Sequence, residues 1–236
     1  MEALEKFRRQ AKISAKAKLT YAGRLDPMAS GVLLILEGAS QAQKEKFLAL
    51  DKKYKAKILF GFSTDSYDLL GMPKTGKPMV ISRVQILRSL DYYKGKVKLP
   101  IPGFSSVQHK GSSLFVLTRQ GKILEKDLPN RLMDIKSLKL LSTGQISATA
   151  LNKKIELGIK KVTGDFRQEK ILKAWNKILK GRKEKYQSIE LLISCGSGTY
   201  IRSIANNIGK RLGMESVLLN LERLSVGKYN LKNTIK

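Results

Sequence analysis

A single carboxylate, Asp26, stands directly before Pro27 in the stretch TYAGRLDPMASGVLLILEG, residues 20–38. Proline fixes its own φ and restricts the residue before it to extended conformations, so the backbone of Asp26 has little freedom. Gly23 and Gly31 bound the turn, and the aliphatic run that follows would anchor it. An aspartate aimed in one direction can serve as a catalytic carboxylate. The alternative is a helix cap or an Asx-turn, the usual role of aspartate beside proline.

A second turn places an arginine near the start of a helix. In the stretch CGSGTYIR, residues 195–202, a strand ends in two glycines and a helix begins near Thr199. Arg202 lies off the predicted buried stripe of this helix, so it can point toward whatever faces the helix start. A solvated arginine is the simpler alternative in a chain with so many basic residues. The stripe itself consists of Ile201, Ile204, Ala205 and Ile208.

The remaining polar candidates carry weaker signals. Asp65 and Asp68 in STDSYDLLG could suggest a metal site, but two acids in a turn more often accept Asx-type hydrogen bonds. His109 lies in a polar loop, where we expect it to contact the backbone or a binding partner instead of acting as a catalyst. Cys195 follows a buried strand and is expected to be structural.

The charge of the chain predicts a polyanionic partner. Lys and Arg number 46 against 19 Asp and Glu, which gives a net charge of +27. Neutralising phosphates releases counterions and drives association with nucleic acid. A basic protein from a basic proteome is the alternative. A role at a membrane surface is disfavoured because the basic residues are spread along the chain.

Length and composition are typical of a globular cytoplasmic protein. The 236 residues, of which 42% are hydrophobic and 28% charged, suffice for one large or two modest domains. No apolar run reaches the roughly 18 residues that span a bilayer, and the amino terminus has no signal-peptide pattern. One Cys and one His allow neither an internal disulfide nor a Cys/His zinc set.

Local periodicity predicts an irregular mixture of helices and strands. We expect helices over residues 3–18, 40–50, 82–93 and 168–180, and one from Thr199 to Gly213. We expect strands over residues 31–38, 53–60, 114–117 and 133–148, and one that ends at Cys195. Ser40 with Gln43 forms a possible capping box, and Ser82 can cap the third helix. Without a regular βαβα rhythm, α+β is the expected class.

The alternation of residues 53–60 predicts a half-buried strand with a largely basic outer face. The inward set is Tyr54, Ala56, Ile58 and Phe60, and the outward set is Lys53, Lys55, Lys57 and Leu59. Two helices have apolar residues at helical spacing that we expect to face inward. These are Val84, Leu87 and Leu90 in one helix and Ile171, Leu172, Trp175, Ile178 and Leu179 in the other.

Three stretches, in order, carry a family resemblance. AGRLDPMASGVLLILEGASQ, followed by KKYKAKILFGFSTDSYDLLG, resembles the catalytic segment of the bacterial TruB-type tRNA pseudouridine synthases. LPIPGFSSVQHKGSSLFVLTRQG is similar to that family's Pro/Ser block, and CGSGTYIRSIANNIGKRLGMESVLLNLERLSVGKY to its C-terminal catalytic block. The matches cover most of residues 1–125 and 187–230. Three ordered blocks are far more specific than one short motif.

The resemblance implies the pseudouridine synthase fold: a mixed, mainly antiparallel sheet with flanking helices and a central RNA-binding cleft. It implies conversion of uridine to pseudouridine in the T-loop of tRNA, at position 55, without a cofactor or metal because the reaction is an isomerisation. Asp26 matches the catalytic aspartate, Arg202 the arginine that pairs with it, and Tyr54 the tyrosine that stacks on the flipped base. The other expected substrate contacts are Tyr21, Arg24, Asp65, Gln108, Lys110 and Tyr200.

The chain also departs from the family pattern. Tyr21 stands where a histidine usually helps to open the T-loop, and Gln108 and Ser197 replace lysines. Phe115 replaces a tyrosine. The family's opening strand has no match, so we expect either a shortened protein or a start assigned too late, and Met1 is not assured as the true start. Beyond SVGKY few residues remain, so we expect no C-terminal PUA domain.

We expect one catalytic domain over residues 1–236, with an insertion of unknown role at about 150–186. A monomer is the default. A non-catalytic RNA-binding protein that helps tRNA to fold, or a synthase acting on another RNA, is the alternative function. Asp26 could act as a nucleophile at the sugar, as a nucleophile at C6 of uracil, or as a base at C2′, and the sequence does not choose among these.

Each of these mechanisms requires an ionised aspartate, which a fixed arginine would keep charged and oriented. We therefore predict an Asp26–Arg202 ion pair that lines the cleft. Side chains more than about 6 Å apart in the structure would contradict it.

Tyr21 generates a prediction about the RNA. A tyrosine can wedge or stack in the T-loop, but it cannot become a cation as histidine does, so we expect T-loop recognition to be retained and altered. Rates of pseudouridine formation on tRNA by Tyr21→His and Tyr21→Ala measure this. A native rate for Tyr21→Ala would remove Tyr21 from the RNA contacts.

Overall fold

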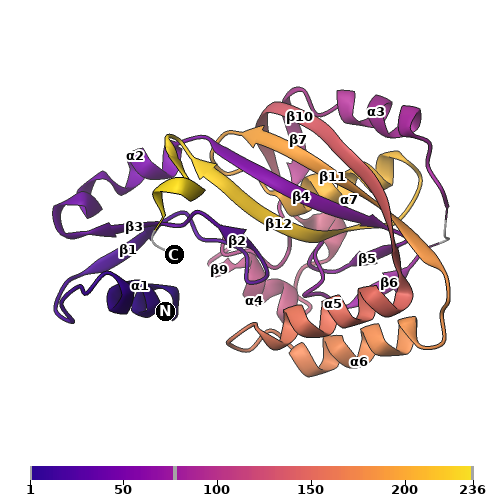
Figure 1. Ribbon diagram of the computed structural model, residues 1–236, viewed down its shortest axis with the longest axis horizontal. Helices are drawn as coiled ribbons and strands as arrows, with labels where there is room; N and C mark the ends of the chain where they lie inside the picture. The colour runs from indigo at the N-terminus through magenta and orange to yellow at the C-terminus, as the bar shows by residue number, and fades with distance from the viewer. Residues whose placement is uncertain (1, 77–78, 235–236) are drawn as a thin grey trace.

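A seven-stranded sheet carries the other elements in the computed structural model, which describes residues 2–76 and 79–234 (Figure 1). Its strands follow the order β13-β12-β4-β11-β10-β7, and β2 pairs in parallel with β12. All other pairings in this sheet are antiparallel, which confirms the expected α+β class. Of the expected domain, Met1 and residues 77–78 and 235–236 lie outside the described residues.

The bounds of these strands are β2 (Ser30–Gly31), β4 (Lys52–Phe60), β7 (Gly95–Pro100), β10 (Asn130–Ser147), β11 (Lys185–Cys195), β12 (Ser216–Val226) and β13 (Tyr229–Asn230). Smaller two-stranded sheets pair β1 (Leu19–Ala22) with β3 (Leu34–Glu37), β5 (Phe62–Thr64) with β6 (Pro73–Thr75), and β8 (Gln108–His109) with β9 (Ser112–Ser113). The helices are α1 (Glu2–Gln10), α2 (Lys44–Ala49), α3 (Arg83–Asp91), α4 (Leu114–Arg119), α5 (Ala148–Lys160), α6 (Gln168–Leu179) and α7 (Ile201–Arg211). Short 3₁₀ turns are η1 (Gly38–Gln43), η2 (Glu125–Asp127) and η3 (Leu231–Asn233).

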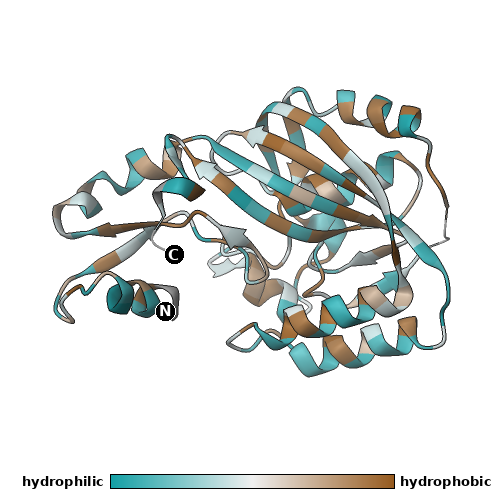
Figure 2. Ribbon diagram, viewed as in Figure 1, coloured by the Kyte–Doolittle hydropathy of each residue, from teal (hydrophilic) through white to brown (hydrophobic). Residues whose placement is uncertain are grey.

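One hydrophobic core lies between the large sheet and helices α3 and α7. The predicted inward set of β4 is buried in it, as is the predicted stripe of α7. Figure 2 shows hydrophobic and hydrophilic residues interleaved along the strands, the pattern expected when the two faces of a strand differ. This core holds α7 against the sheet and so fixes the helix that carries Arg202.

A second core forms where α5 and α6 pack together beside the sheet. Trp175 is fully buried there, and its indole N–H donates to the carbonyl of Leu69 at 3.1 Å. Leu59, predicted to lie on the basic outer face of β4, is also buried in this core. That prediction was wrong because the α5–α6 pair covers this end of the strand.

Among the described residues, no helix combines the length and apolar content needed to cross a membrane.

Helix α3 begins as its sequence predicts but buries a different face. Ser82 and Gln85 form a capping box that satisfies the free N–H groups of the first turn. Ile86 and Leu90 are buried, whereas Val84 and Leu87 are exposed, at 57% and 42%. The expected burial of Val84 and Leu87 was therefore wrong. Apolar residues occur on two adjacent faces of α3, and their spacing alone did not show which face is buried.

Several predicted bounds and types were also wrong. The first helix ends at Gln10 instead of residue 18, and residues 114–117 form part of helix α4, which Ser113 caps at the N–H of Val116. Residues 40–50 divide into η1 and α2 without the expected capping box, because the Ser40 hydroxyl donates to the carbonyl of Glu37. The pieces expected at 133–148 belong to the single long strand β10, and α5 was not predicted.

The turn that carries Asp26 connects an arm to the edge of the sheet. β1 and β3 form the arm, which lies with α1 and α2 at the left of Figure 1. β2 then joins Ser30 and Gly31 to Glu222 and Arg223 of β12. The turn is thus held at both ends by strand pairing.

The buried thiol gives a test of this fold. Cys195 is fully buried in β11, and burial raises the pKa of its thiol to about 11. At pH 8 only about one thiol in a thousand would be ionised, and the thiolate is the reactive form. We expect native protein to resist a thiol-specific disulfide reagent and denatured protein to react fully. Rapid labelling of the native protein would contradict the packing of β11.

Candidate active site

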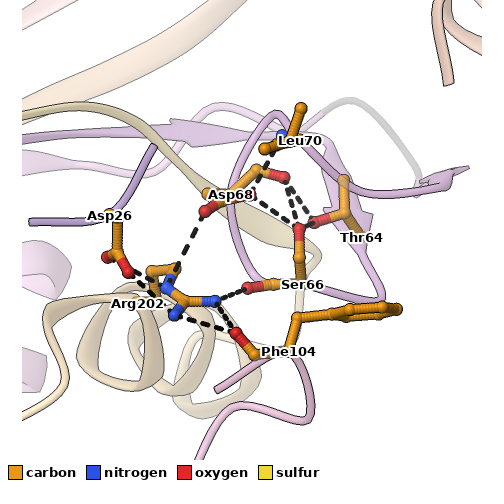
Figure 3. Close-up of polar contacts among 7 residues, drawn as sticks. All are labelled: Asp26, Thr64, Ser66, Asp68, Leu70, Phe104 and Arg202. Atoms are coloured by element: carbon orange, nitrogen blue, oxygen red, sulfur yellow. Dashed lines mark hydrogen bonds and ion pairs between the residues drawn. The ribbon is translucent and has the colours of Figure 1, made fainter. Parts of the chain in front are cut away.

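Asp26 and Arg202 form a two-point ion pair (Figure 3). The Arg202 Nε–H donates to Oδ2 of Asp26 at 3.0 Å, and its Nη2–H donates to Oδ1 at 2.9 Å. The Arg202 side chain is 6% exposed and that of Asp26 is 32% exposed. The predicted pair is therefore confirmed as a contact. The carboxylate keeps an open side on which a substrate can bind.

Two backbone carbonyls complete the shell of the Arg202 guanidinium. The Nη1–H donates to the carbonyl of Ser66 at 3.0 Å, and both Nη groups donate to the carbonyl of Phe104 at 3.3 Å. A guanidinium has five N–H donors in a rigid fork, so acceptors on three sides fix its plane. Burial disfavours its charge, yet the carboxylates of Asp26 and Asp68 raise the pKa of Arg202 above its ordinary value.

Asp68 is a second acid of the same network. Its Oδ1 accepts from the N–H of Leu70 at 2.9 Å and the hydroxyl of Ser66 at 2.6 Å, the local hydrogen bonding predicted for this turn. Its Oδ2 lies 3.7 Å from Nε of Arg202. Burial raises the pKa of Asp68, and Arg202 acts in the opposite direction. Sequence reasoning missed this ion pair, because no residue near Asp68 in the sequence indicates that Arg202 is its partner.

Arg223 anchors the turn that carries Asp26. This arginine is 2% exposed, and it donates to the carbonyls of Val32 at 2.6 Å, Gly23 at 3.0 Å and Arg24 at 3.4 Å. Gly31 has a φ of +106°, and a Cβ there would lie 2.2 Å from the carbonyl oxygen of Arg223. Only glycine allows this approach. Both ends of the Asp26 turn therefore contact the same residue of β12, Arg223.

Two pockets adjoin the ion pair, and Asp68 lines both. The larger has about 390 Å³ of empty space, and its walls include Phe104, Phe115, Phe166, Arg167 and Arg202. The smaller has about 270 Å³, and its walls include Asp26, Met28, Leu218, Leu219 and Leu221. The guanidinium and the two carboxylates therefore stand between an aromatic hollow and an aliphatic one.

The two predicted site tyrosines other than Tyr21 lie close to this network. Tyr54 on β4 is 9% exposed, and burial raises the pKa of its hydroxyl, with Arg223 and Asp26 among the charges that act on it. Tyr200 is the N-cap residue of α7, and its ring lies 5.8 Å from the guanidinium of Arg131. Burial raises the pKa of Tyr200 as well, with Arg202 and Asp26 among the nearby charges.

The predicted RNA contacts lie farther out or are already engaged. Tyr21 and Arg24 stack at 5.9 Å at the start of the Asp26 turn, and neither lines either pocket. Gln108 and Lys110 are exposed on the β8–β9 hairpin, outside both pockets. Asp65 accepts from the N–H of Met72 and forms an ion pair with an arginine of the α5–α6 turn.

Sequence reasoning missed three residues that shape the site: Asp68 as an ion-pair partner, Arg167 and Arg223. The sequence signal for Arg223 was weak, because Asn220 and Glu222 are also polar residues of its strand, SVLLNLERLSV. Across residues 2–76 and 79–234, no three or more His, Cys, Asp or Glu side chains gather in a way that could hold a metal ion.

Comparisons with known proteins show which family the chain resembles in sequence. Residues 8–166 match the model of the TruB family pseudouridylate synthase (N terminal domain). The chain is 28% identical over 225 residues to "tRNA pseudouridine synthase B" of Clostridium tetani (strain Massachusetts / E88), covering 95% of this chain and 63% of that protein. It is 30% identical over 228 residues to the protein of the same name in Clostridioides difficile (strain 630), covering 96% and 62%. It thus spans less than two thirds of the length of these relatives.

Solved structures show a similar fold. The "Crystal Structure of a Cbf5-Nop10-Gar1 Complex" matches with a TM-score of 0.58 and 16% identity, covering 98% of this chain and 46% of that chain. The "Structure of H/ACA RNP bound to a substrate RNA containing 2'-deoxyuridine" matches with a TM-score of 0.55 and 13% identity, covering 98% and 44%.

The anchoring role of Arg223 can be measured as stability. We expect Arg223→Lys to lower the free energy of unfolding by about 2–4 kcal/mol, because lysine cannot reach all three buried carbonyls and leaves some unpaired. Chemical denaturation measures the change. Arg88→Lys, at an exposed position of α3, is the matched control and should differ little from the native protein. Equal stability of the two variants would show that the turn does not depend on Arg223.

Proposed function

The chain belongs to the TruB family of pseudouridylate synthases, and from this premise we propose that it converts uridine to pseudouridine in the T-loop of tRNA, at position 55. The family match confirms the resemblance seen in the sequence, and the solved structures confirm the expected fold. The observation that carries the proposal is the two-point pair of Asp26 and Arg202 beside open pockets. The tRNA substrate is supported by the names of the relatives.

Isomerisation breaks the C1′–N1 bond of uridine, turns the uracil and joins C1′ to C5, while the proton on C5 is lost and N1 gains one. No atom is added and no net electron transfer occurs. Asp26 is the acting carboxylate, as nucleophile at the sugar, as nucleophile at C6 or as base at C2′. Arg202 holds it aimed, because two parallel hydrogen bonds from the guanidinium fix the orientation of the carboxylate. Asp68 adds a second carboxylate, 3.7 Å from the same Nε of Arg202.

The target base must leave its stack before it can react. Flipping costs a few kcal/mol, and stacking on one aromatic ring returns roughly 1–3 kcal/mol. Tyr54 is the residue we assign to that stack, and Tyr200 to the neighbouring wall. The adjoining aliphatic pocket gives the Asp26 carboxylate apolar walls.

The RNA backbone is met by the basic outer parts of the molecule. We assign contacts with the T-arm to Tyr21 and Arg24 near the arm and to Gln108 and Lys110 on the β8–β9 hairpin. The net charge of +27 favours such an electrostatic partner. Asp65 is already engaged by the N–H of Met72 and by Arg167, so we assign it a role in the wall of the site and not a direct contact with RNA. We propose one catalytic domain that acts as a monomer in the cytoplasm.

The decisive experiment measures pseudouridine. Total RNA from cells with and without the gene, and from cells expressing Asp26→Asn, is mapped for pseudouridine. We expect the T-loop mark to disappear in the deletion and not to return with Asp26→Asn, whose rate on purified tRNA should fall by at least about a thousandfold. Asp91→Asn, an exposed acid on α3, is the matched control and should restore the mark.

The alternatives give different outcomes. A deletion that removes a pseudouridine from another RNA would identify a different substrate. Restoration of tRNA function by Asp26→Asn without any mark would identify a non-catalytic RNA-binding protein. Native-speed isomerisation by purified Asp26→Asn would overturn the mechanism.

A further inference from the structure

The turn between α5 and α6, residues 161–167, reaches the wall of the candidate active site. Its last residue, Arg167, donates from Nη1 to Oδ2 of Asp65 at 2.9 Å and from Nη2 to Oδ1 at 3.3 Å. The same guanidinium lies 4.3 Å from the centre of the Phe104 ring. The Arg167 side chain therefore contacts two loops, those of Asp65 and Phe104, which are distant from it in sequence.

The turn is built to hold Arg167 in place. The Gln168 amide donates to the carbonyls of Val162 at 3.1 Å and Gly164 at 2.6 Å, and it accepts from the N–H of Phe166 at 2.8 Å. Arg119 of α4 forms an ion pair with Asp165. Arg167 itself has a φ of +64°, a left-handed conformation that is uncommon for a residue with a Cβ. Such a conformation persists where surrounding contacts enforce it, often at functional sites.

Both loops that Arg167 contacts supply hydrogen-bond acceptors to Arg202. Asp65 directly precedes Ser66, whose carbonyl accepts from Nη1 of Arg202. Phe104 offers its ring to Arg167 and its carbonyl to both Nη groups of Arg202. A shift of either loop would move an acceptor of the guanidinium that aims Asp26. Gly71 allows this packing, because a Cβ there would lie 2.6 Å from Oδ1 of Asp65.

We propose that Arg167 is a positioning residue, which fixes the Asp65 and Phe104 loops and through them the orientation of Arg202 toward Asp26. Its catalytic consequence rests on the proposed function, whereas its effect on Arg202 does not. Direct binding of RNA phosphate is not the main role of Arg167, because its fork already serves a carboxylate and its side chain is 22% exposed. The α5–α6 pair thereby acquires a role in the site.

The first test separates rate from binding. For Arg167→Ala we expect the single-turnover rate on saturating tRNA to fall by about 10- to 100-fold, since small misplacements of a catalytic group cost this much. The dissociation constant for tRNA should stay within about twofold of the native value. Arg167→Lys keeps the charge but loses the planar fork, so its rate should fall between the two. Lys173→Ala, an exposed cation on α6, is the matched control and should behave as native protein.

The second test does not require activity. In protein labelled with ¹⁵N-arginine, hydrogen exchange of the Arg202 Nε–H, assigned with Arg202→Lys, should accelerate at least about tenfold in Arg167→Ala but not in Lys173→Ala. Unchanged exchange, or a loss of turnover that is wholly weaker tRNA binding, would overturn the proposal. Absence of pseudouridine formation by native protein would instead contradict the proposed function, and the exchange result would still decide the role of Arg167.

Discussion

The charge of Arg202 is buried, and the rest of the site exists to satisfy it. A guanidinium removed from water is costly unless carboxylates and carbonyls replace its hydration, and removing one partner from such a pair costs about 3–5 kcal/mol. Here Asp26 and Asp68 supply charge, and Ser66 and Phe104 supply carbonyls. These acceptors come from three segments: the Asp26 turn, the turn that carries Ser66 and Asp68, and the loop that carries Phe104. The guanidinium consequently holds these segments in fixed positions, and the Asp26 carboxylate is fixed with them.

A second arginine performs the same function for the backbone. Arg223 is buried, and it binds the Asp26 turn through three backbone carbonyls. Because β2 pairs with β12 at this residue, the turn is tied to the sheet by strand pairing and by side-chain bonds together. Asp26 is thus constrained at its carboxylate by α7 and at its backbone by β12. This double constraint is the kind of preorganisation that lets one acid act without reorganising its surroundings.

Sequence patterns identified the parts of the site that depend on local order. The stripe of α7 and the inward set of β4 are properties of short segments, and both were confirmed. The Asp26–Arg202 pair was predicted only after the family resemblance joined two turns far apart in the chain. Leu59 was misassigned because the helices that bury it arrive from residues 148–179, and α4 was mistaken for a strand because its six residues are too short to show a period. Arg167 had no local signal, since its carboxylate partner, Asp65, lies 102 residues earlier in the chain.

The pairing of β2 with β12 has a consequence for the order of events during translation. The turn that carries the acid emerges early from the ribosome, but its guanidinium anchor and its strand partner are both encoded some two hundred residues later. Domains fold as their chain becomes available, and contacts of high sequence separation form late. A nascent chain therefore cannot fix the orientation of Asp26 until β12 has left the exit tunnel.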